Sequence, residues 1–213
     1  MTQEERSEKS RAAILEAALA LFSHVGYRAT SIRDIAGRAG VSTGSVYHHF
    51  RDKEAIFDTL LQQFWAFSAE PSFPLNRALE AGAFPNRLEE LAGAAREVIA
   101  GWRPHVALMY VDVVEFDGRH IHKFYADLAR RCEAFAASHP AELAAAGPFH
   151  PDLPLAPAMV MTIRVFIYYF VVELLFGVPN HYGMSSDEAI QMMSGILKRG
   201  MLQQPGAARP AAE

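Results

Sequence analysis

The sequence has 213 residues, of which 51% are hydrophobic, and it contains a single cysteine. This length and apolar content allow a buried core without metals, while one cysteine excludes an intrachain disulfide framework and suits a reducing cytoplasm. The net charge of −4 taken alone argues against a nucleic-acid-binding protein, but residues 1–51 hold seven Lys and Arg against five Asp and Glu, a net +2, which leaves −6 for the remainder. The basic part is where electrostatic steering toward DNA would act.

The opening stretch, MTQEERSEKSR, is charged and lacks the apolar region of a signal peptide, so we expect a cytoplasmic protein. Residues 1–8 are predicted to be mobile. A helix is predicted from Lys9 to His24, where apolar residues repeat at helical spacing, and Gly26 ends it.

The stretch from Thr30 to Lys53 has the pattern of a helix-turn-helix. Ser31 can cap a first short helix, and Gly40 stands where a left-handed residue ends it. Ser42 can cap a second helix, Thr43 to His49, in which Val46 and then Phe50 point inward. Small, polar and aromatic side chains project from the opposite face, and such a helix fits the major groove of DNA. The alternative is a small helical bundle with a solvated face.

These residues resemble the TetR family of bacterial transcriptional repressors. The resemblance implies an all-α homodimer whose N-terminal domains bind a palindromic operator in double-stranded DNA and whose C-terminal domains bind a small molecule. Many members have a basic residue where this chain has Thr43, so phosphate anchoring would fall to Tyr47, Lys53 and nearby arginines. The matching residues, all within about the first sixty, are Phe22, Gly26, Tyr27, Thr30, Ser31, Asp34, Ile35, Ala36, Ala39, Gly40, Val41, Ser42, Tyr47, His48, His49, Phe50, Lys53 and Glu54.

We therefore predict an N-terminal three-helix DNA-binding domain over residues 1–51, a helical effector-binding and dimerisation domain over 52–202, and a disordered tail over 203–213. Base reading is assigned to the second short helix, and phosphate binding to hydroxyl and basic side chains around it. The predicted DNA contacts are Arg28, Ser31, Arg33, Thr43, Gly44, Ser45, Tyr47, His48 and Lys53.

The remaining chain is predicted to be entirely helical, with neither strand-like alternation nor internal repeats. Asp52 can cap a helix that links the two domains and continues until the prolines Pro71 and Pro74. One short helix is predicted within 71–85. Longer helices are predicted over Asn86–Trp102, Pro104–Phe116 and about Arg119–Ser138, followed by a short turn from Pro140 to Gly147 and a final helix capped by Ser185 or Ser186.

The segment Ala158–Phe176 is the most apolar and is close to membrane-span length. Arg164 and Glu173 interrupt it, and a central Arg costs about 2.5 to 3.5 kcal/mol to insert, so a buried soluble helix without membrane insertion is favoured. The preceding proline-rich stretch, Pro148–Pro157, is predicted to be irregular. In the family that the chain resembles, the last two long helices form the dimer interface, and we expect the same pairing here.

Catalysis is not expected, since the sequence lacks P-loop, GxGxxG and GxSxG patterns and Cys132 has no evident partner to activate it. Asp112, Glu115, His120 and His122 could offer metal ligands, but their spacing favours surface or capping roles, so neither a metal nor a cofactor is predicted. Surplus aromatic residues instead favour a pocket for a hydrophobic or aromatic effector with one polar group. Its predicted lining is Phe64, Trp65, Trp102, Met109, Tyr110, Phe116, Tyr125, Phe166, Tyr169, Phe170 and Glu173.

The function that follows is a ligand-responsive DNA-binding regulator, a repressor released from its operator by the effector. The alternative is a dimeric helical interaction protein with a vestigial helix-turn-helix. The absence of Lys and Arg from Thr43 to His49 keeps this alternative open.

Overall fold

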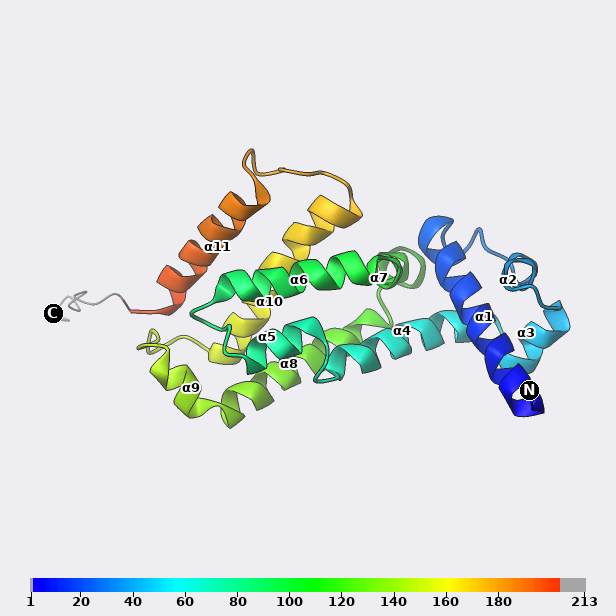
Figure 1. Cartoon of the computed structure of the whole chain (residues 1–213), viewed down its shortest axis with the longest axis horizontal. Helices are drawn as coiled ribbons and strands as arrows, with labels where there is room; N and C mark the ends of the chain where they lie inside the picture. The colour runs from blue at the N-terminus through cyan, green and yellow to red at the C-terminus, as the bar shows by residue number, and fades with distance from the viewer. Residues whose placement is uncertain (1, 204–213) are drawn as a thin grey trace. The chain divides into compact units, whose positions relative to one another are not determined.

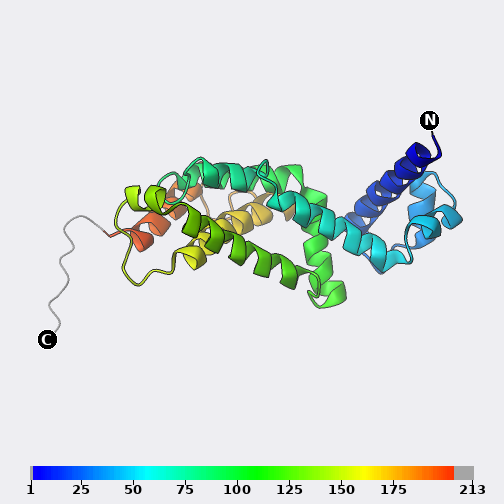
Figure 2. The same cartoon turned by 90° about the horizontal axis from the view of Figure 1, so that it is seen from below.

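A computed structural model describes residues 2–203, and the outcome for the predicted tail beyond Gln203 lies outside the described residues. The chain forms two compact units (Figures 1 and 2). Unit 1 comprises Met1–Glu70 with Trp102–Phe124, and unit 2 comprises Pro71–Gly101 with Tyr125–Glu213. The described residues contain helices and a single isolated bridge, between Phe149 and Leu202, which confirms the all-α prediction.

Unit 1 begins with a long helix against which two short helices pack, coloured in blues in Figure 1. A fourth helix follows directly, and a fifth joins the unit from much later in the chain. The helices are α1 (Gln3–His24), α2 (Ile32–Ala39), α3 (Thr43–His49), α4 (Lys53–Ala69) and α7 (Arg103–Phe116), with the beginning of α8 (Ile121–Ser138).

Helix α1 begins earlier than the sequence pattern predicted. Thr2 is its N-cap: the Glu5 amide donates to Thr2 Oγ1 at 3.2 Å, and the Thr2 amide donates to Glu5 Oε2 at 2.8 Å. This reciprocal capping box satisfies amides that the first turn of a helix leaves unpaired. The prediction that residues 1–8 are mobile was therefore wrong for Gln3 to Glu8, because a cap can start a helix on polar residues.

The core of unit 1 joins the three N-terminal helices to α4 and α7. Phe116 at the end of α7 lies between two rings, with centroids 4.6 Å from Tyr27 and 4.8 Å from Phe57. Phe22 and Phe57 are fully buried beside them, and Leu108 of α7 is also fully buried in the same cluster. Helix α7 is thus part of the hydrophobic core of the helix-turn-helix unit.

Unit 2 is built around α6 and α10, which pack against each other, with α5 and α11 also on α6. A salt bridge of 3.1 Å between Lys198 of α11 and Glu89 of α6 adds to this packing. The helices of this unit are α5 (Pro74–Glu80), α6 (Leu88–Gly101), the rest of α8, α9 (Pro140–Ala145), α10 (Leu155–Phe170), η1 (Val171–Leu175) and α11 (Ser186–Met201).

Two details of α10 differ from the prediction. The helix begins at Leu155 and contains Pro157, because a proline in the first turn displaces no intrahelical hydrogen bond. At the other end it continues into a π-helical turn, η1, whose wider spacing changes the helical phase. Val171 at this junction is buried, whereas Arg164 and Tyr168 on α10 are exposed.

By length and composition alone, the continuous helix Leu155–Leu175 could cross a membrane, but the core helix of a soluble protein passes the same test. Its inner face is used for packing, since Met159, Phe166 and Tyr169 are fully or almost fully buried.

The C-terminal end of the described chain is held in place by a hydrogen bond. The Gln203 amide donates to the Pro148 carbonyl at 2.8 Å, so disorder was wrongly predicted at this first residue of the tail.

Candidate nucleic-acid interface

Local hydrogen bonds fix both the start of α2 and the turn that follows it, where the Val41 amide donates to the Ala36 carbonyl at 3.0 Å. The Asp34 amide donates to Ser31 Oγ at 3.2 Å, and Asp34 Oδ2 accepts from the Ser31 amide at 2.9 Å and from its hydroxyl at 2.6 Å. These hydrogen bonds from Ser31 lower the pKa of Asp34. Gly40 ends α2 in the left-handed region with φ 68°, where a side chain would be strained. The predicted helix-turn-helix is therefore present with the predicted caps.

Helix α3 presents one face to solvent and buries the other. The Ser45 amide donates to the capping Ser42 hydroxyl at 3.1 Å, while Val46 is fully buried. On the outer side Tyr47 is 58% exposed. Thr43, Gly44 and His48 are exposed as well, and Ser45 is half-buried. This is the arrangement that reading base edges in a groove requires.

Gly44 is not demanded by the fold. A Cβ atom at this position would meet only Ser42 Oγ, at 3.7 Å, and the residue has no left-handed backbone. The small residue therefore leaves open space outside the helix, where another backbone could approach closely.

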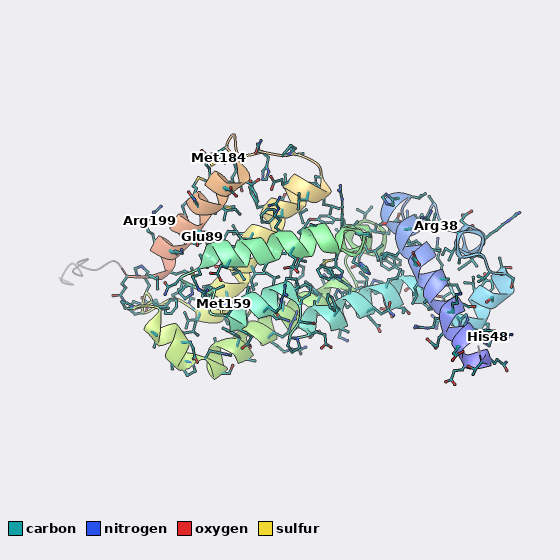
Figure 3. The ribbon with its side chains drawn as sticks, in the orientation of Figure 1. Arg38, His48, Glu89, Met159, Met184 and Arg199 are labelled. Atoms are coloured by element: carbon teal, nitrogen blue, oxygen red, sulfur yellow. The ribbon has the colours of Figure 1, made fainter. Side chains whose placement is uncertain are left out.

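In Figure 3, Arg38 of α2 and His48 of α3 lie at different ends of the helix-turn-helix, and both side chains are exposed.

Lys53 is held by the protein more tightly than the sequence indicated. Its Nζ donates to the carbonyls of Tyr27 at 2.7 Å and Thr30 at 2.8 Å, and it lies 4.1 Å from the centroid of the Tyr27 ring. Burial lowers the pKa of Lys53, and the Glu115 carboxylate opposes that shift. Two of the three ammonium hydrogens are thus used internally, which leaves one for a phosphate.

The other predicted phosphate contacts are exposed side chains, and one of them is already paired with a carboxylate. Arg28 lies between the two carbonyl partners of Lys53 in sequence, and its Nε is 2.8 Å from Oε2 of Glu115 in α7. Ser31 and Arg33 are exposed at the beginning of α2. The pattern did not reveal the ion pair with Glu115, because it joins residues far apart in sequence.

The predicted effector residues divide between the two units. In unit 1, Phe64 stacks on His105 with centroids 5.4 Å apart, and Trp65 stacks on Phe124 at 6.2 Å. Trp65 Nε1 and His105 Nδ1 are buried without a hydrogen-bond partner, and burial lowers the pKa of His105. The remaining predicted residues of this unit are Trp102, Met109 and Tyr110, together with Phe116, which lies in the core described above.

In unit 2, Phe166, Tyr169 and Phe170 are buried in the core, with Tyr169 only 1% exposed. The Tyr169 hydroxyl has no hydrogen-bond partner, although His181 packs on the ring with centroids 4.7 Å apart. Tyr125 lies under the Arg164 guanidinium at 5.0 Å, and Glu173 accepts a hydrogen bond from the Ser186 hydroxyl. The group therefore combines packed aromatic rings with one unsatisfied buried hydroxyl.

The groups weighed as metal ligands have structural roles. Asp112 is fully buried and its carboxylate accepts from the amides of His120 at 3.2 Å and Ile121 at 3.0 Å, so it caps the start of α8. Among residues 2–203, no group of three or more His, Cys, Asp or Glu side chains converges as a metal site would require. Burial raises the pKa of the Cys132 thiol, which disfavours the nucleophilic thiolate.

The capped, sharply joined helices α2 and α3, with the outer face of α3 exposed, define a helix-turn-helix protein. Residues 14–60 match the family model described as bacterial regulatory proteins, tetR family. The N-terminal part of the chain thus has the sequence pattern of the TetR family, as the sequence motifs indicated.

Comparison with known proteins supports this assignment. Over 60 residues the chain is 50% identical to the HTH-type transcriptional repressor KstR2 of Mycobacterium tuberculosis, a match that covers 27% of this chain and 30% of that protein. The match to KstR2 of Rhodococcus jostii is 37% over 107 residues, covering 49% of this chain and 50% of that protein. The sequence similarity thus spans half or less of these relatives' length.

Solved structures extend the likeness in fold to nearly the whole chain. A protein from Mesorhizobium loti described as a TetR-family transcriptional regulator has a TM-score of 0.65 at 21% identity, covering 95% of this chain and 100% of that one. The structure of the ketosteroid transcriptional regulator KstR2 of M. tuberculosis has a TM-score of 0.58 at 24% identity, covering 96% and 98%. The C-terminal helices therefore share the TetR-type fold.

Proposed function

We propose that this protein is a DNA-binding transcriptional regulator, a repressor that binds a palindromic operator as a homodimer and leaves it when a small apolar effector binds. The exposed outer face of α3 carries the proposal: Thr43, Gly44, Tyr47 and His48 point to solvent while Val46 is buried beneath them. A helix that exposes hydroxyl, imidazole and phenol groups around a glycine can approach base edges closely. The named repressors among the relatives support the same role.

The decisive test is selection of bound sequences from a random pool of double-stranded DNA. A dimer with two identical recognition helices should select an inverted repeat, with half-sites about one helical turn apart or slightly more. The alternative, an interaction protein with a vestigial helix-turn-helix, predicts that no DNA is bound even at low salt. The match of residues 14–60 to the family does not favour that alternative.

The homodimer is proposed to form through α10 and α11. Large apolar side chains on these helices are exposed in the single chain, including Met161, Tyr168, Met192 and Ile196. Tyr168 is 60% exposed although it lies on the most apolar helix. Pairing these faces across a two-fold axis would remove them from water and place two copies of α3 on one DNA site. Light scattering during size-exclusion chromatography tests the dimer directly.

The effector is proposed to be a largely apolar molecule with one hydrogen-bonding group. Each unit has aromatic residues of its own that can supply apolar contact area, and the unpaired Tyr169 hydroxyl in unit 2 or, as the alternative site, His105 Nδ1 in unit 1 could satisfy the polar group. One structural neighbour is named a ketosteroid regulator, which makes steroid-like compounds a sensible first panel. An effector should raise the melting temperature of the free protein and release operator DNA.

A variant can separate effector binding from packing. Tyr169→Ala would empty a buried site and cost about 3 to 5 kcal/mol, by analogy with other large aromatic truncations, so it could unfold the protein. Tyr169→Phe removes only a hydroxyl without a partner. The Phe variant should bind operator DNA normally, and it should lose effector-induced release if Tyr169 contacts the polar group. If effector-induced release from DNA were unchanged in this variant, another group, such as His105, would have to bind the polar group of the effector.

A further inference from the structure

One carboxylate lies beside two cations of the proposed DNA-binding face. Glu115 of α7 is paired with Arg28, with 2.8 Å between Oε2 and Nε. It also acts electrostatically on Lys53, whose Nζ is fixed to the carbonyls on either side of Arg28, those of Tyr27 and Thr30. A single anion thus adjoins two of the side chains proposed to bind phosphate.

The position of Glu115 is imposed by the core of unit 1. Its neighbour Phe116 is packed between Tyr27 and Phe57, and α7 ends at Asp117 in a left-handed conformation. The carboxylate is consequently held at the loop that carries Arg28 and is itself only 16% exposed. A flexible surface carboxylate would not be held in this way.

The guanidinium group, in contrast, remains accessible. The Arg28 side chain is 81% exposed, so the guanidinium is free to turn away from Glu115 toward a phosphate. The nearest other ion pairs in this part of the unit, Arg119 with Glu54 at 2.8 Å and Arg51 with Asp52 at 2.7 Å, already balance their own charges. Glu115 is therefore the carboxylate that directly opposes transfer of Arg28 to DNA.

We propose that Glu115 is an internal competitor of the DNA backbone for Arg28, so that helix α7 limits how much positive charge the helix-turn-helix offers to phosphate. The proposal rests on the proposed function, because it needs DNA as the second anion. Glu115 is a restraining residue that acts through Arg28 and makes no contact with DNA itself. Its removal should strengthen binding to all DNA sequences alike, since phosphate contacts are independent of base sequence.

Salt dependence gives the competition a specific signature. An unpaired arginine that binds phosphate releases a condensed cation from DNA, and each such contact adds about 0.9 to the slope of log affinity against log salt. When Arg28 leaves Glu115 to reach the phosphate, the abandoned carboxylate attracts a cation in turn. In the wild-type protein, Arg28 and Glu115 together therefore cause little net release of cations and add little to the salt slope. Once Glu115 is neutral, Arg28 should add nearly the full slope of one phosphate contact.

The test is Glu115→Gln in the full-length protein, with binding to selected and unrelated DNA duplexes measured from low to moderate salt. Gln is close in size and helix propensity to Glu, so α7 should persist, and the melting temperature checks this. We expect about two- to fivefold tighter binding at low salt, the range of an exposed ion pair, and a slope steeper by up to about 0.9.

Two further variants identify the cause. Glu97→Gln makes the same charge change at a carboxylate that pairs with Arg77 in unit 2, and it should leave binding and slope unchanged. In an Arg28→Ala background, Glu115→Gln should have a much smaller effect, because the competitor has lost its ion-pair partner and only its electrostatic action on Lys53 remains. If Glu97→Gln, or Glu115→Gln in the Arg28→Ala background, raised DNA affinity as much as Glu115→Gln does in the wild-type protein, the gain would come from general charge repulsion. That result would overturn the proposal.

The remaining outcomes are equally decisive. Unchanged or weaker binding by the Glu115→Gln variant would also overturn it, since the carboxylate would then be irrelevant or would preorganise Arg28 for DNA. If the wild-type protein binds no DNA at low salt, the regulator proposal itself fails and this competition fails with it. Wild-type binding without an effect of Glu115 would refute the competition alone.

Discussion

Replacing Lys53 with methionine should destabilise unit 1 whether or not DNA is present. The change keeps most of the aliphatic stem over the Tyr27 ring but removes the ammonium group that donates to the Tyr27 and Thr30 carbonyls at 2.7 and 2.8 Å. Hydrogen bonds that involve a charged group contribute about 1.5 to 3 kcal/mol each. Because Lys53 is only half-buried, water compensates for part of this loss, and we expect a total cost of about 2 to 3 kcal/mol.

Tryptophan fluorescence during urea unfolding can measure this cost in the right part of the protein. The chain has 2 tryptophans, Trp65 and Trp102, and both belong to unit 1. The matched control is Lys198→Met, which breaks an ion pair with Glu89 in unit 2. That pair is partly exposed, so the control should cost at most about 1 kcal/mol and leave the tryptophan transition in place.

The result that would refute the argument is a Lys53→Met transition within about 0.5 kcal/mol of the wild type, because surface substitutions without a structural role fall in that range. DNA binding gives a separate answer. The slope against salt should fall by up to about 0.9 if the third ammonium hydrogen meets a phosphate. An unchanged slope with lost stability would make Lys53 a purely structural residue.

Four further substitutions test other parts of the structure. Ser45→Ala should relax preference at particular base pairs in selected DNA, whereas Tyr47→Phe should weaken all sequences alike; the same loss in both would remove the division between base reading and phosphate binding. Tyr168→Glu should give folded monomers in analytical ultracentrifugation. A persistent dimer would exclude the exposed face of α10 as the dimer interface. Burial lowers the pKa of His105 from 6.5, so the folded protein binds fewer protons than the unfolded chain and stability should fall as the pH drops below about 6.5. His105→Phe should flatten that dependence in urea unfolding at pH 5.5 and 7.5, and an equally steep loss would assign it to other groups.

The features predicted well from sequence are those fixed by neighbours in the chain. Ser31, Gly40 and Ser42 act within one or two turns, and they determine where α2 begins and ends and where α3 begins. The same local rule applies at the start of α1. Thr2 and Glu5 have the capping spacing that was recognised at Ser31, yet the polar composition around them led to a prediction of mobility. Likewise, the prolines before α10 concealed a helix start at Leu155.

The features that escaped prediction depend on contacts between distant segments. Lys53 was correctly placed in the first turn of α4, but its carbonyl partners lie more than twenty residues away. Sequence spacing gave no partner for Glu115, because Arg28 lies in the loop between α1 and α2, far from α7 in the sequence. The phase change at η1 also depends on packing, because no residue type in VVELL requires a π-helical turn. Sequence patterns therefore located the recognition surface but not the charges that restrain it.

The sharing of Phe116 and Leu108 with the N-terminal helices has a consequence during synthesis of the protein. A ribosome releases α1 to α4 long before α7, so Tyr27 and Phe57 must wait for Phe116, which follows them by 116 − 27 = 89 and 116 − 57 = 59 residues. The nascent N-terminal helices consequently expose aromatic surface until more than half of the chain has emerged. A fragment that stops at residue 70 would keep that surface permanently uncovered and should be prone to aggregate, whereas one that reaches Phe124 contains every segment of unit 1.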